Sequence, residues 1–419
     1  MKVLLPTLGS AGDVHPFLAI GQAMQARGHD VEVMTNPVFA DMVQQAGLSF
    51  HPVGSAEHFA DAMNSPKLWH PVDGFGVFWR RMARHAMEAV YQRIASHAEN
   101  QAANGPCVVL ATPLMFGARL ANEKLNVPLV TAYTAATMLR SCENPLTMAH
   151  WRVPRWVPRV VRAAAWRALD KVKLNPMVAS DLPPFRQRLG LPVLNQSVFG
   201  QWVHSPQAGV TLFPAWFAPA PADWPLLVRQ AGFPLYDGDT ARGLGTELSR
   251  FLDAGEPPIV FTPGSAMGQG HDFFSAAVRT CTELGRRGVL LTSSPSQIPA
   301  GLPAAVHYSA YAPFGLLLPR AAALVHHGGI GNSAQALRAG IPQLLNPMGF
   351  DQFDNAMRLE LLGVGACVTR HDPRFASMAP RLHELLGSSR VARACREAAA
   401  SVKRDTALDT ICDLLESAR

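Results

Sequence analysis

The sequence has no apolar run long enough to span a membrane and no cysteine pattern typical of a metal site or a disulfide framework. Its apolar stretches are well short of the roughly eighteen residues that a spanning helix needs. The N-terminal run ends at Pro6, too early for the core of a signal peptide. The six cysteines are scattered, without a Cys-x-x-Cys pair. We therefore expect a cytoplasmic protein whose membrane contact, if it has one, is peripheral and on the cytoplasmic face of the inner membrane.

Signatures of DNA- and RNA-binding modules are also missing, so nucleic acid is not expected as a partner. The formal net charge of +6 is compatible with an anionic small molecule or an anionic lipid. The length of 419 residues favours two or three domains, and 48% hydrophobic residues can form a large core.

What the sequence does contain is a recurring strand–helix–strand pattern. The segment "KVLLP" predicts a buried strand, apolar residues from Phe17 to Arg27 recur at helical spacing, and "DVEVMT" predicts the next strand. Similar strands follow glycine in the second half, as in "RRG" before "VLLTSS" and "RAG" before "IPQLLNP". The pattern is typical of parallel sheets, and it predicts an α/β fold with two similar halves.

A stretch rich in proline and tryptophan, from about Pro214 to Gly245, separates the halves. Its polar end, "YDGDTARG", is typical of an interdomain linker. The predicted parts are an N-terminal domain at 1–235, a linker at 236–250, a C-terminal domain at 251–400, and a C-terminal helix at 401–419 that could cross back to the first domain.

The segment "ALVHHGGIGNSAQALRAG" predicts a strand, a glycine-rich turn and a helix. Glycines let a ligand approach the backbone, and the helix start offers unpaired N–H groups with a partial positive charge of roughly half an electron. Such a turn can hold phosphate. His326 or His327 could donate to a diphosphate, and the sequence leaves open which one does. Asn332 and Ser333 could cap the helix or contact the phosphate; the alternative is a turn that is merely tight.

Two further groups of polar residues lie where strands are predicted to end. Asp351 and Gln352 follow the strand "PQLLNP", at the edge where open parallel sheets bind ligands, and together they suit a polyhydroxylated ligand. Asp351 could instead be an ordinary helix N-cap. Asp13 and His15 lie in the predicted loop "TLGSAGDVHPF", where either could act as a general base and Asp13 could equally be a cap.

One segment departs from the α/β pattern. From Trp151 to Lys173, three tryptophans alternate with seven arginine and lysine residues around one acid, Asp170. A basic helix that carries tryptophan can lie in an anionic lipid interface. The alternative is an excursion of the first domain whose tryptophans pack on the body and whose arginines are solvated. Pro154 and Pro158 favour this alternative, because they interrupt the first turns.

Taken in order, several motifs resemble those of nucleotide-sugar-dependent glycosyltransferases of family 1, the GT-B type, which includes bacterial macrolide, sterol and lipid enzymes. These motifs are "GSAGDVHPF" (9–17), "GFPLYD" (232–237), "FTPGS" (261–265), "YAPFGLLLP" (311–319), "HHGGIGNS" (326–333) and "PMGFDQFDNA" (347–356). The similarity covers essentially the whole chain. Within the family, "FGVFW" (75–79), "HSPQ" (204–207) and "LFPAWFAP" (212–219) most resemble the rhamnosyltransferase branch of rhamnolipid synthesis.

The resemblance implies two Rossmann-like domains that face each other across a cleft, and an inverting transfer with no metal and no cofactor beyond the donor substrate. The branch implies transfer of L-rhamnose from dTDP-L-rhamnose to the hydroxyl of a 3-(3-hydroxyalkanoyloxy)alkanoate, giving a mono-rhamnolipid. The alternative within the family is a UDP-glucose-dependent enzyme acting on a hydroxy-lipid, sterol or macrolide. Outside it, the chain could be an inactive partner that activates another transferase, or a sugar-nucleotide epimerase.

Carried over residue by residue, the resemblance implies Asp13 as the base on the acceptor hydroxyl, with His15 a weaker candidate. The residues implied to bind the nucleotide sugar are Ser265, Tyr311, His326 or His327, Gly328, Gly329, Gln335, Asp351 and Gln352. An apolar acceptor needs large apolar side chains. The N-terminal half supplies Phe75, Phe78, Trp79, Trp216 and Phe217, for which core packing is an equal alternative.

Overall fold

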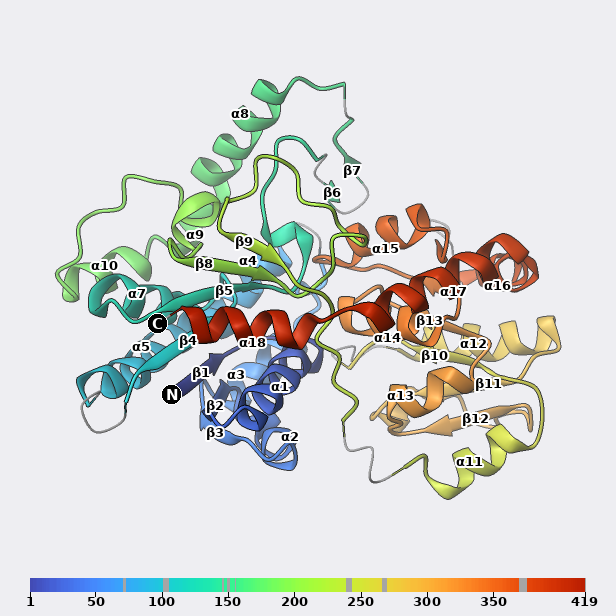
Figure 1. Ribbon diagram of the computed structural model, residues 1–419. Helices are drawn as coiled ribbons and strands as arrows, with labels where there is room; N and C mark the ends of the chain where they lie inside the picture. The colour runs from blue at the N-terminus through green and yellow to red at the C-terminus, as the bar shows by residue number, and fades with distance from the viewer. Residues whose placement is uncertain are drawn as a thin grey trace. The chain divides into compact units, whose positions relative to one another are not determined.

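The computed structural model describes residues 1–70, 73–100, 105–144, 147–148, 151–154, 156–238, 243–265, 270–368 and 375–418. It divides into two compact units, shown in Figure 1. The first comprises Met1–Gly9, Pro16–Pro234 and Thr406–Arg419, and the second comprises Ser10–His15 and Leu235–Asp405.

The first unit is built on a seven-stranded sheet in the order β3-β2-β1-β4-β5-β8-β9, with every pair of neighbours parallel. Its strands are β1 (Lys2–Pro6), β2 (Asp30–Thr35), β3 (Ser49–Pro52), β4 (Cys107–Ala111), β5 (Leu129–Tyr133), β8 (Ala208–Thr211) and β9 (Val228–Gln230). All five residues of β1 and of β5 are buried, as expected for central strands covered on both faces. A separate antiparallel pair joins β6 (Thr147–Met148) to β7 (Trp151–Arg152).

Helices and short helical turns accompany this sheet. They are α1 (Ala11–Ala26), α2 (Ala40–Gln45), α3 (Ala56–Met63), α4 (Gly74–Phe78), α5 (Arg84–Glu99), α7 (Phe116–Leu125), α8 (Arg159–Leu169), α9 (Asn175–Val178), α10 (Leu182–Arg188) and α18 (Ala407–Ser417), with 3₁₀ turns η1 (Pro37–Phe39) and η3 (Ala136–Met138) and π-helical turns η2 (Trp79–Ala83), η4 (Asp170–Leu174) and η5 (Val198–Trp202). An aromatic cluster lies at the core, where the ring of Phe116 is 4.7 Å from that of Trp79 and 5.1 Å from that of Trp202.

The last helix, α18, packs with the first unit. Arg27, just after α1, donates to Asp413 at 2.6 Å and to Asp409 at 3.0 Å, while His29 lies 2.8 Å from Glu416. The helix before it, α17, continues to Arg404, so the second unit ends at Asp405 rather than at residue 400.

The second unit has a six-stranded parallel sheet in the order β12-β11-β10-β13-β14-β15. Its strands are β10 (Ile259–Thr262), β11 (Gly288–Leu291), β12 (Val306–Ser309), β13 (Ala323–His326), β14 (Gln343–Leu345) and β15 (Gly365–Cys367). Its helices are α11 (Thr246–Asp253), α12 (His271–Leu284), α13 (Phe314–Leu317), α14 (Ile330–Ala339), α15 (Gln352–Leu361), α16 (Met378–Gly387) and α17 (Ser389–Arg404), with 3₁₀ turns η7 (Pro295–Gln297) and η8 (Leu318–Arg320).

Two sequence predictions are wrong in detail. The predicted loop at 7–17 is helical from Ala11. Burial of the side chains of Val14 and Phe17 stabilises a helix that continues through Pro16. The predicted linker at 236–250 is also partly helical, since α11 begins at Thr246. Strand β9 lies before that linker, within the proline-rich stretch. Residues 239–242 of that linker lie outside the described residues.

Candidate active site

Three loops of the second unit meet at the carboxyl edge of its sheet. Strands β10 and β14 both pair with β13, and His326 at the end of β13 is in register with Thr262 on one side and Leu345 on the other. The chain runs outward from β10 in both directions, so the β10–β13 pair is the switch point at which open α/β sheets bind ligands. The residues that follow Thr262, His326 and Leu345 are therefore neighbours.

His326 is an internal support of the turn. Its side chain is fully buried, its Nδ1 accepts from the Gly328 N–H at 3.1 Å, and its Nε2 lies 3.0 Å from Gln343 Oε1. Since Nδ1 accepts, Nε2 carries the proton and donates to the Gln343 carbonyl oxygen. Burial lowers the pKa of His326 to about 3, so the ring is neutral. Both of its nitrogens are used inside the fold, which leaves neither for a diphosphate.

His327, unlike His326, is not tied into the turn by hydrogen bonds from both of its ring nitrogens in the part of the chain that the structure describes. Its ring lies against the backbone of Gly264 and of Gly329: a Cβ on Gly264 would be 2.6 Å from Cε1, and a Cβ on Gly329 would be 2.5 Å from Nε2. Its buried Nδ1 has no hydrogen-bond partner among the described residues. Burial lowers the pKa of His327 to about 4, so the ring is neutral near pH 7 and keeps one N–H to donate. The geometry therefore favours His327 over His326 as a ligand contact.

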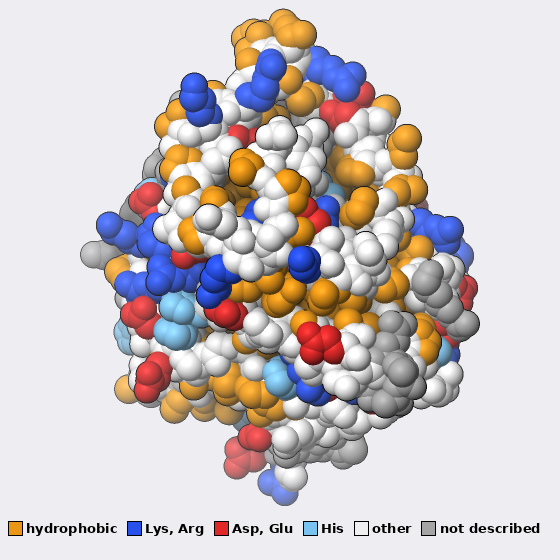
Figure 2. Space-filling view, turned by 90° about the vertical axis from the view of Figure 1, so that its left-hand side faces the viewer, with side chains coloured by type: hydrophobic (Ala, Val, Ile, Leu, Met, Phe, Trp, Pro, Cys, Tyr) orange, Lys and Arg blue, Asp and Glu red, His pale blue; other side chains and the backbone are white. Residues whose placement is uncertain are grey.

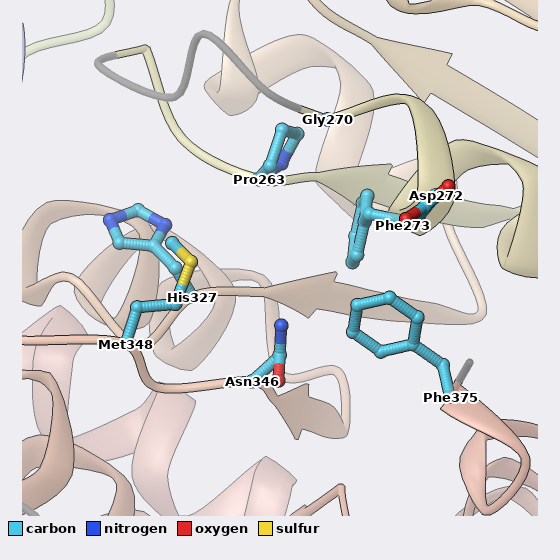
Figure 3. A pocket seen from close by; sticks show the side chains of 8 residues that line it. All are labelled: Pro263, Gly270, Asp272, Phe273, His327, Asn346, Met348 and Phe375. Carbon is cyan, nitrogen blue, oxygen red and sulfur yellow. The ribbon is translucent and has the colours of Figure 1, made fainter. Parts of the chain in front are cut away.

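A pocket of about 200 Å³ opens beside His327, entirely within the second unit. Figure 3 shows His327 and Met348 at one end and the rings of Phe273 and Phe375 at the other, with Asn346 between them. Pro263 and the start of α12, at Gly270 and Asp272, complete the lining. The pocket combines an imidazole, an amide and an aromatic pair 5.9 Å apart, a mixture typical of small-molecule sites.

The helix that follows His327 begins without a side-chain cap. Its N-cap residue is Gly329, and Ser333 Oγ turns back to donate to the Gly329 carbonyl at 3.0 Å. Ser333 is thus a fully buried internal contact and not a phosphate ligand in this conformation, whereas Asn332 is partly exposed in the first turn. Uncapped N–H groups and the helix dipole favour an anion at this place.

Asp351 and Gln352 begin α15 beside the same turn. Asn355 Nδ2 donates to Asp351 Oδ2 at 2.7 Å and to the Gly328 carbonyl at 3.0 Å, so one amide joins the carboxylate to the glycine turn. Gln352 Oε1 accepts from the N–H groups of Met348 and Gly349, which fixes the loop. Asn355 was missed in the sequence, where only its spacing of four residues from Asp351 on a helix could have indicated it.

Burial raises the pKa of Asp351 to about 7, against the lowering effect of the hydrogen bond from Asn355, and the nearby charge of Asp13 raises it further. Asp13 groups with the second unit, as part of Ser10–His15. Its Oδ2 accepts from Ser10 N at 2.8 Å and Ser10 Oγ at 3.1 Å, yet burial outweighs these donors and raises its pKa. Two carboxyl groups with raised pKa values are a common mark of a functional site.

His15 follows Asp13 on α1, and its ring lies 5.3 Å from that of Tyr236. Burial lowers the pKa of His15 to about 4, so it could accept a proton only weakly. Burial therefore acts in opposite directions on the two candidate bases, since it lowers the pKa of His15 and raises that of Asp13.

Gln335, another predicted residue, contacts the segment at Tyr236 and Asp237, near the start of the second unit. Gln335 donates to the Tyr236 carbonyl at 3.1 Å, and Arg338 donates to both Gln335 and Asp237, at 2.7 and 2.8 Å. Burial would raise the pKa of Asp237, but the bond from Arg338 outweighs it and holds that pKa below its usual value. The contacts of Gln335 thus anchor residues 236–237 to α14.

The remaining two residues predicted to bind the nucleotide sugar lie at the surface of the same unit. Tyr311 is 56% exposed, and its hydroxyl lies against the backbone of Gly238. Ser265 is exposed, in the turn after β10.

Comparison with known proteins identifies the chain. Residues 3–142 match the glycosyltransferase family 28 N-terminal domain, and residues 289–412 match the C-terminal domain of erythromycin biosynthesis protein CIII-like proteins. O-mycaminosyltylonolide 6-deoxyallosyltransferase of Streptomyces fradiae is 30% identical over 387 residues, covering 87% of this chain and 85% of that protein. The chain is a GT-B glycosyltransferase.

Two further comparisons agree with this identification. The vancomycin aglycone glucosyltransferase of Amycolatopsis orientalis is 28% identical, over 94% of this chain and 92% of that protein. The solved glycosyltransferase of kitacinnamycin superposes on the enzyme with a TM-score of 0.74 and 19% identity, covering 100% of this chain and 98% of that chain. The predicted family and α/β architecture are thus confirmed. The relatives named here do not indicate the narrower rhamnolipid branch.

The enzyme contains one Asp-x-Asp triplet, a pattern that can hold a metal, at residues 237–239. Asp237 is committed to Arg338, and Asp239 lies outside the described residues. Among the residues that the structure describes, no group of three histidine, cysteine or acidic side chains could hold a metal ion.

The apolar residues predicted to bind the acceptor fall into two sets. Phe78, Trp79 and Phe217 are buried, and Trp79 Nε1 donates to Asp181 at 2.9 Å, so core packing accounts for them. Phe75 and Trp216 are partly exposed, and Trp216 Nε1 has no hydrogen-bond partner in the described part of the enzyme. Only this second set keeps a surface for a ligand.

Gly264→Ala is expected to destabilise the enzyme and to weaken donor binding. The backbone at Gly264 has φ +96°, which costs a non-glycine residue roughly 1–2 kcal/mol, and the added methyl would push His327 out of place. Thermal unfolding and the KM for the donor would measure both effects. Gly331→Ala is the matched control, since its Cβ would meet nothing within 4 Å in helix α14. The Tm of the Gly331→Ala variant should rise slightly. An equal fall in Tm in Gly264→Ala and Gly331→Ala would contradict the role given to Gly264.

Asp351→Asn is expected to raise the Tm at neutral pH. The wild-type carboxyl has a pKa near 7 in the fold against 3.8 in the unfolded chain. As pH rises from about 4 to about 7, the Asp351 carboxyl ionises in the unfolded chain but keeps its proton in the folded enzyme. The wild type therefore loses stability over this range, whereas the Asp351→Asn variant does not. The Tm difference should grow across this window and then level off. Asp272→Asn, at an exposed carboxyl, is the control; a pH-independent difference at position 351 would contradict the raised pKa.

Proposed function

We propose that the enzyme transfers a sugar from a nucleoside diphosphate to a hydroxyl of an apolar acceptor, with inversion at the anomeric carbon. The observation that carries the proposal is the unpaired Nδ1 of His327, held between two glycine backbones where the uncapped helix α14 begins. An imidazole N–H and a helix N-terminus side by side suit an anionic diphosphate.

In this mechanism the acceptor oxygen attacks the anomeric carbon while Asp13 takes its proton. The bond from that carbon to the diphosphate oxygen breaks, and the nucleoside diphosphate leaves with the bonding electrons. The raised pKa of Asp13 supports the role of base, because a carboxylate with a higher pKa binds the proton more tightly. The helix N-terminus and the N–H of the neutral His327 ring would stabilise the negative charge of the leaving group, so the proposal includes no metal.

Asp351 and Gln352 would face the sugar. Gln352 Oε1 is occupied by two backbone N–H groups, so its Nε2 is the part left for a sugar hydroxyl. Asp351 would accept from a hydroxyl when ionised, which its pKa near 7 permits only at neutral pH and above. We expect kcat/KM for the donor to fall as pH drops below about 7, and Asp351→Asn to flatten this limb.

The relatives favour a large natural product as the acceptor. They are named for transfer of 6-deoxyallose to O-mycaminosyltylonolide and of glucose to the vancomycin aglycone. A glucosyl or deoxysugar donor with a macrocycle, sterol or hydroxy-lipid acceptor is therefore our first candidate. The second is the transfer of L-rhamnose from dTDP-L-rhamnose to a 3-(3-hydroxyalkanoyloxy)alkanoate, which the segments "FGVFW", "HSPQ" and "LFPAWFAP" favour. The six free cysteines suit a cytoplasmic enzyme in either case.

The decisive experiment is mass spectrometry of the products. The enzyme is incubated with each of dTDP-rhamnose, dTDP-glucose and UDP-glucose, in combination with a macrolide aglycone, a sterol and a hydroxyacyl-hydroxyacid. A product whose mass has increased by one sugar identifies both substrates, and Asp13→Asn serves as the inactive control. Turnover of the donor without any acceptor would favour an epimerase, whereas no turnover with any pair would favour an inactive partner protein.

A further inference from the structure

Helix α8 turns its apolar side outward. None of its residues is buried. Between Val160 and Val172, the exposed side chains are Val160, Val161, Ala164, Ala165, Arg167, Ala168, Lys171 and Val172, of which six are apolar. Val160 is 73% exposed and Val172 is 78% exposed. A helix on the surface of a globular protein normally shows the reverse pattern, so this face is suited to a partner.

The inner side of the helix carries its polar contacts. Arg162 donates to the Glu143 carbonyl at 3.0 Å, and Trp166 Nε1 donates to the Ser141 carbonyl at 3.4 Å. The Trp166 ring also lies 4.6 Å from the guanidinium of Arg140. These contacts fix the rotation of α8, so the outward direction of its valines follows from the packing on the opposite side.

The outward side also bears tryptophan and positive charge. Trp156, just before the helix, is 81% exposed. Arg167 and Lys171 are exposed, while the one acid of the segment, Asp170, is buried and paired with Arg140 at 2.7 Å. Figure 2 shows hydrophobic and basic side chains together at the top of the molecule, where Figure 1 draws α8.

The neighbouring charged side chains do not cancel the positive charge of this outward side. Arg159 lies 3.5 Å from Glu143 and Lys173 lies 3.9 Å from Asp73, so these two cations are already paired. Arg155 and the side chains of Trp151 and Arg152 lie outside the part of the chain that the structure describes. The predicted alternative in which the tryptophans pack on the body holds for Trp166 and is wrong for Trp156, since only the former is covered.

We propose that the α8 face, defined as Trp156, Val160, Val161, Arg167, Lys171 and Val172, binds the surface of an anionic lipid bilayer. Exposed valines and a tryptophan can enter the boundary between headgroups and acyl chains, while Arg167 and Lys171 meet the lipid phosphates. A second copy of the chain fits less well, because a two-fold contact of this face with itself would bring the same cations together. This inference is independent of the proposed donor and acceptor.

The test is co-sedimentation of the full chain with vesicles. We expect binding to vesicles of phosphatidylglycerol and phosphatidylcholine at low salt, and much weaker binding to phosphatidylcholine alone or at high salt. Val160→Asp should weaken binding by about tenfold or more, because it removes one apolar anchor. The pair Arg167→Gln and Lys171→Gln should lose about fivefold per cation on the anionic vesicles only.

Val193→Asp is the matched control, since Val193 is 85% exposed in the first unit and lies outside the α8 face. It should bind as the wild type does, and the Tm of every variant should match that of the wild type. Equal loss in Val160→Asp and Val193→Asp, or no binding of the wild type at low salt, would overturn the proposal. So would a wild-type dimer in light scattering that Val160→Asp converts to a monomer, since the face would then join two copies.

Discussion

Replacing Asp13 with asparagine is expected to lower kcat by roughly two to four orders of magnitude while the fold remains intact. Asparagine has the same shape, and its amide oxygen can still accept from the Ser10 N–H group that holds the aspartate, 2.8 Å away in the wild type. It cannot accept the proton of the acceptor hydroxyl. The rate of sugar transfer measures the loss, and the Tm reports that the fold is retained.

Two variants accompany this measurement. Asp41→Asn changes an exposed acid in the first turn of α2 and should leave the rate unchanged. His15→Gln should reduce the rate far less than Asp13→Asn, because the low pKa of His15 makes it a weak base. If His15→Gln lost the larger factor, the base would be His15 and the role given to Asp13 would be wrong.

Replacing His327 with alanine is expected to lower kcat by about two to three orders of magnitude, the usual cost of removing one donor that stabilises developing negative charge. The Tm should change little, because Nδ1 of His327 has no hydrogen-bond partner among the described residues. The measurement is the transfer rate at saturating donor, together with thermal unfolding.

The neighbouring histidine supplies the matched control. His326→Ala would leave Gln343 Oε1 and the Gly328 N–H without partners in the core, at a cost of about 1–3 kcal/mol for each group. Its main effect should therefore be a lower Tm. A stable but inactive His326→Ala enzyme, beside an active His327→Ala enzyme, would reverse the roles of the two residues.

Much of the fold could be predicted from the pattern of apolar residues. The strands "KVLLP" and "DVEVMT" became β1 and β2, and their valine, leucine and methionine side chains are buried, as is typical of parallel strands covered on both faces. The helical start of α1 could not be predicted, because Gly9, Gly12 and Pro16 all disfavour a helix locally. The buried positions of Val14 and Phe17 exist only in the folded core and outweigh that preference.

Only part of the candidate site could be predicted from the sequence. The turn after β13 stands out because glycine and histidine adjoin a strand and a helix in one short segment. The supports of that turn lie on other elements: Gly264 follows β10, Gln343 lies on β14 and Asn355 lies on α15. No local pattern connects them to the histidines, since they become neighbours only when the three strands pair.

The sequence by itself therefore determined the α/β architecture and the segments that carry the chemistry, because apolar periodicity and glycine-rich turns are local properties. Only the tertiary structure decided which histidine is hydrogen-bonded inside the core and which one keeps a ring nitrogen without a partner among the described residues, because that depends on the partner offered by β14. It also decided that the valines of α8 face outward, because the contacts of Arg162 and Trp166 fix the rotation of the helix.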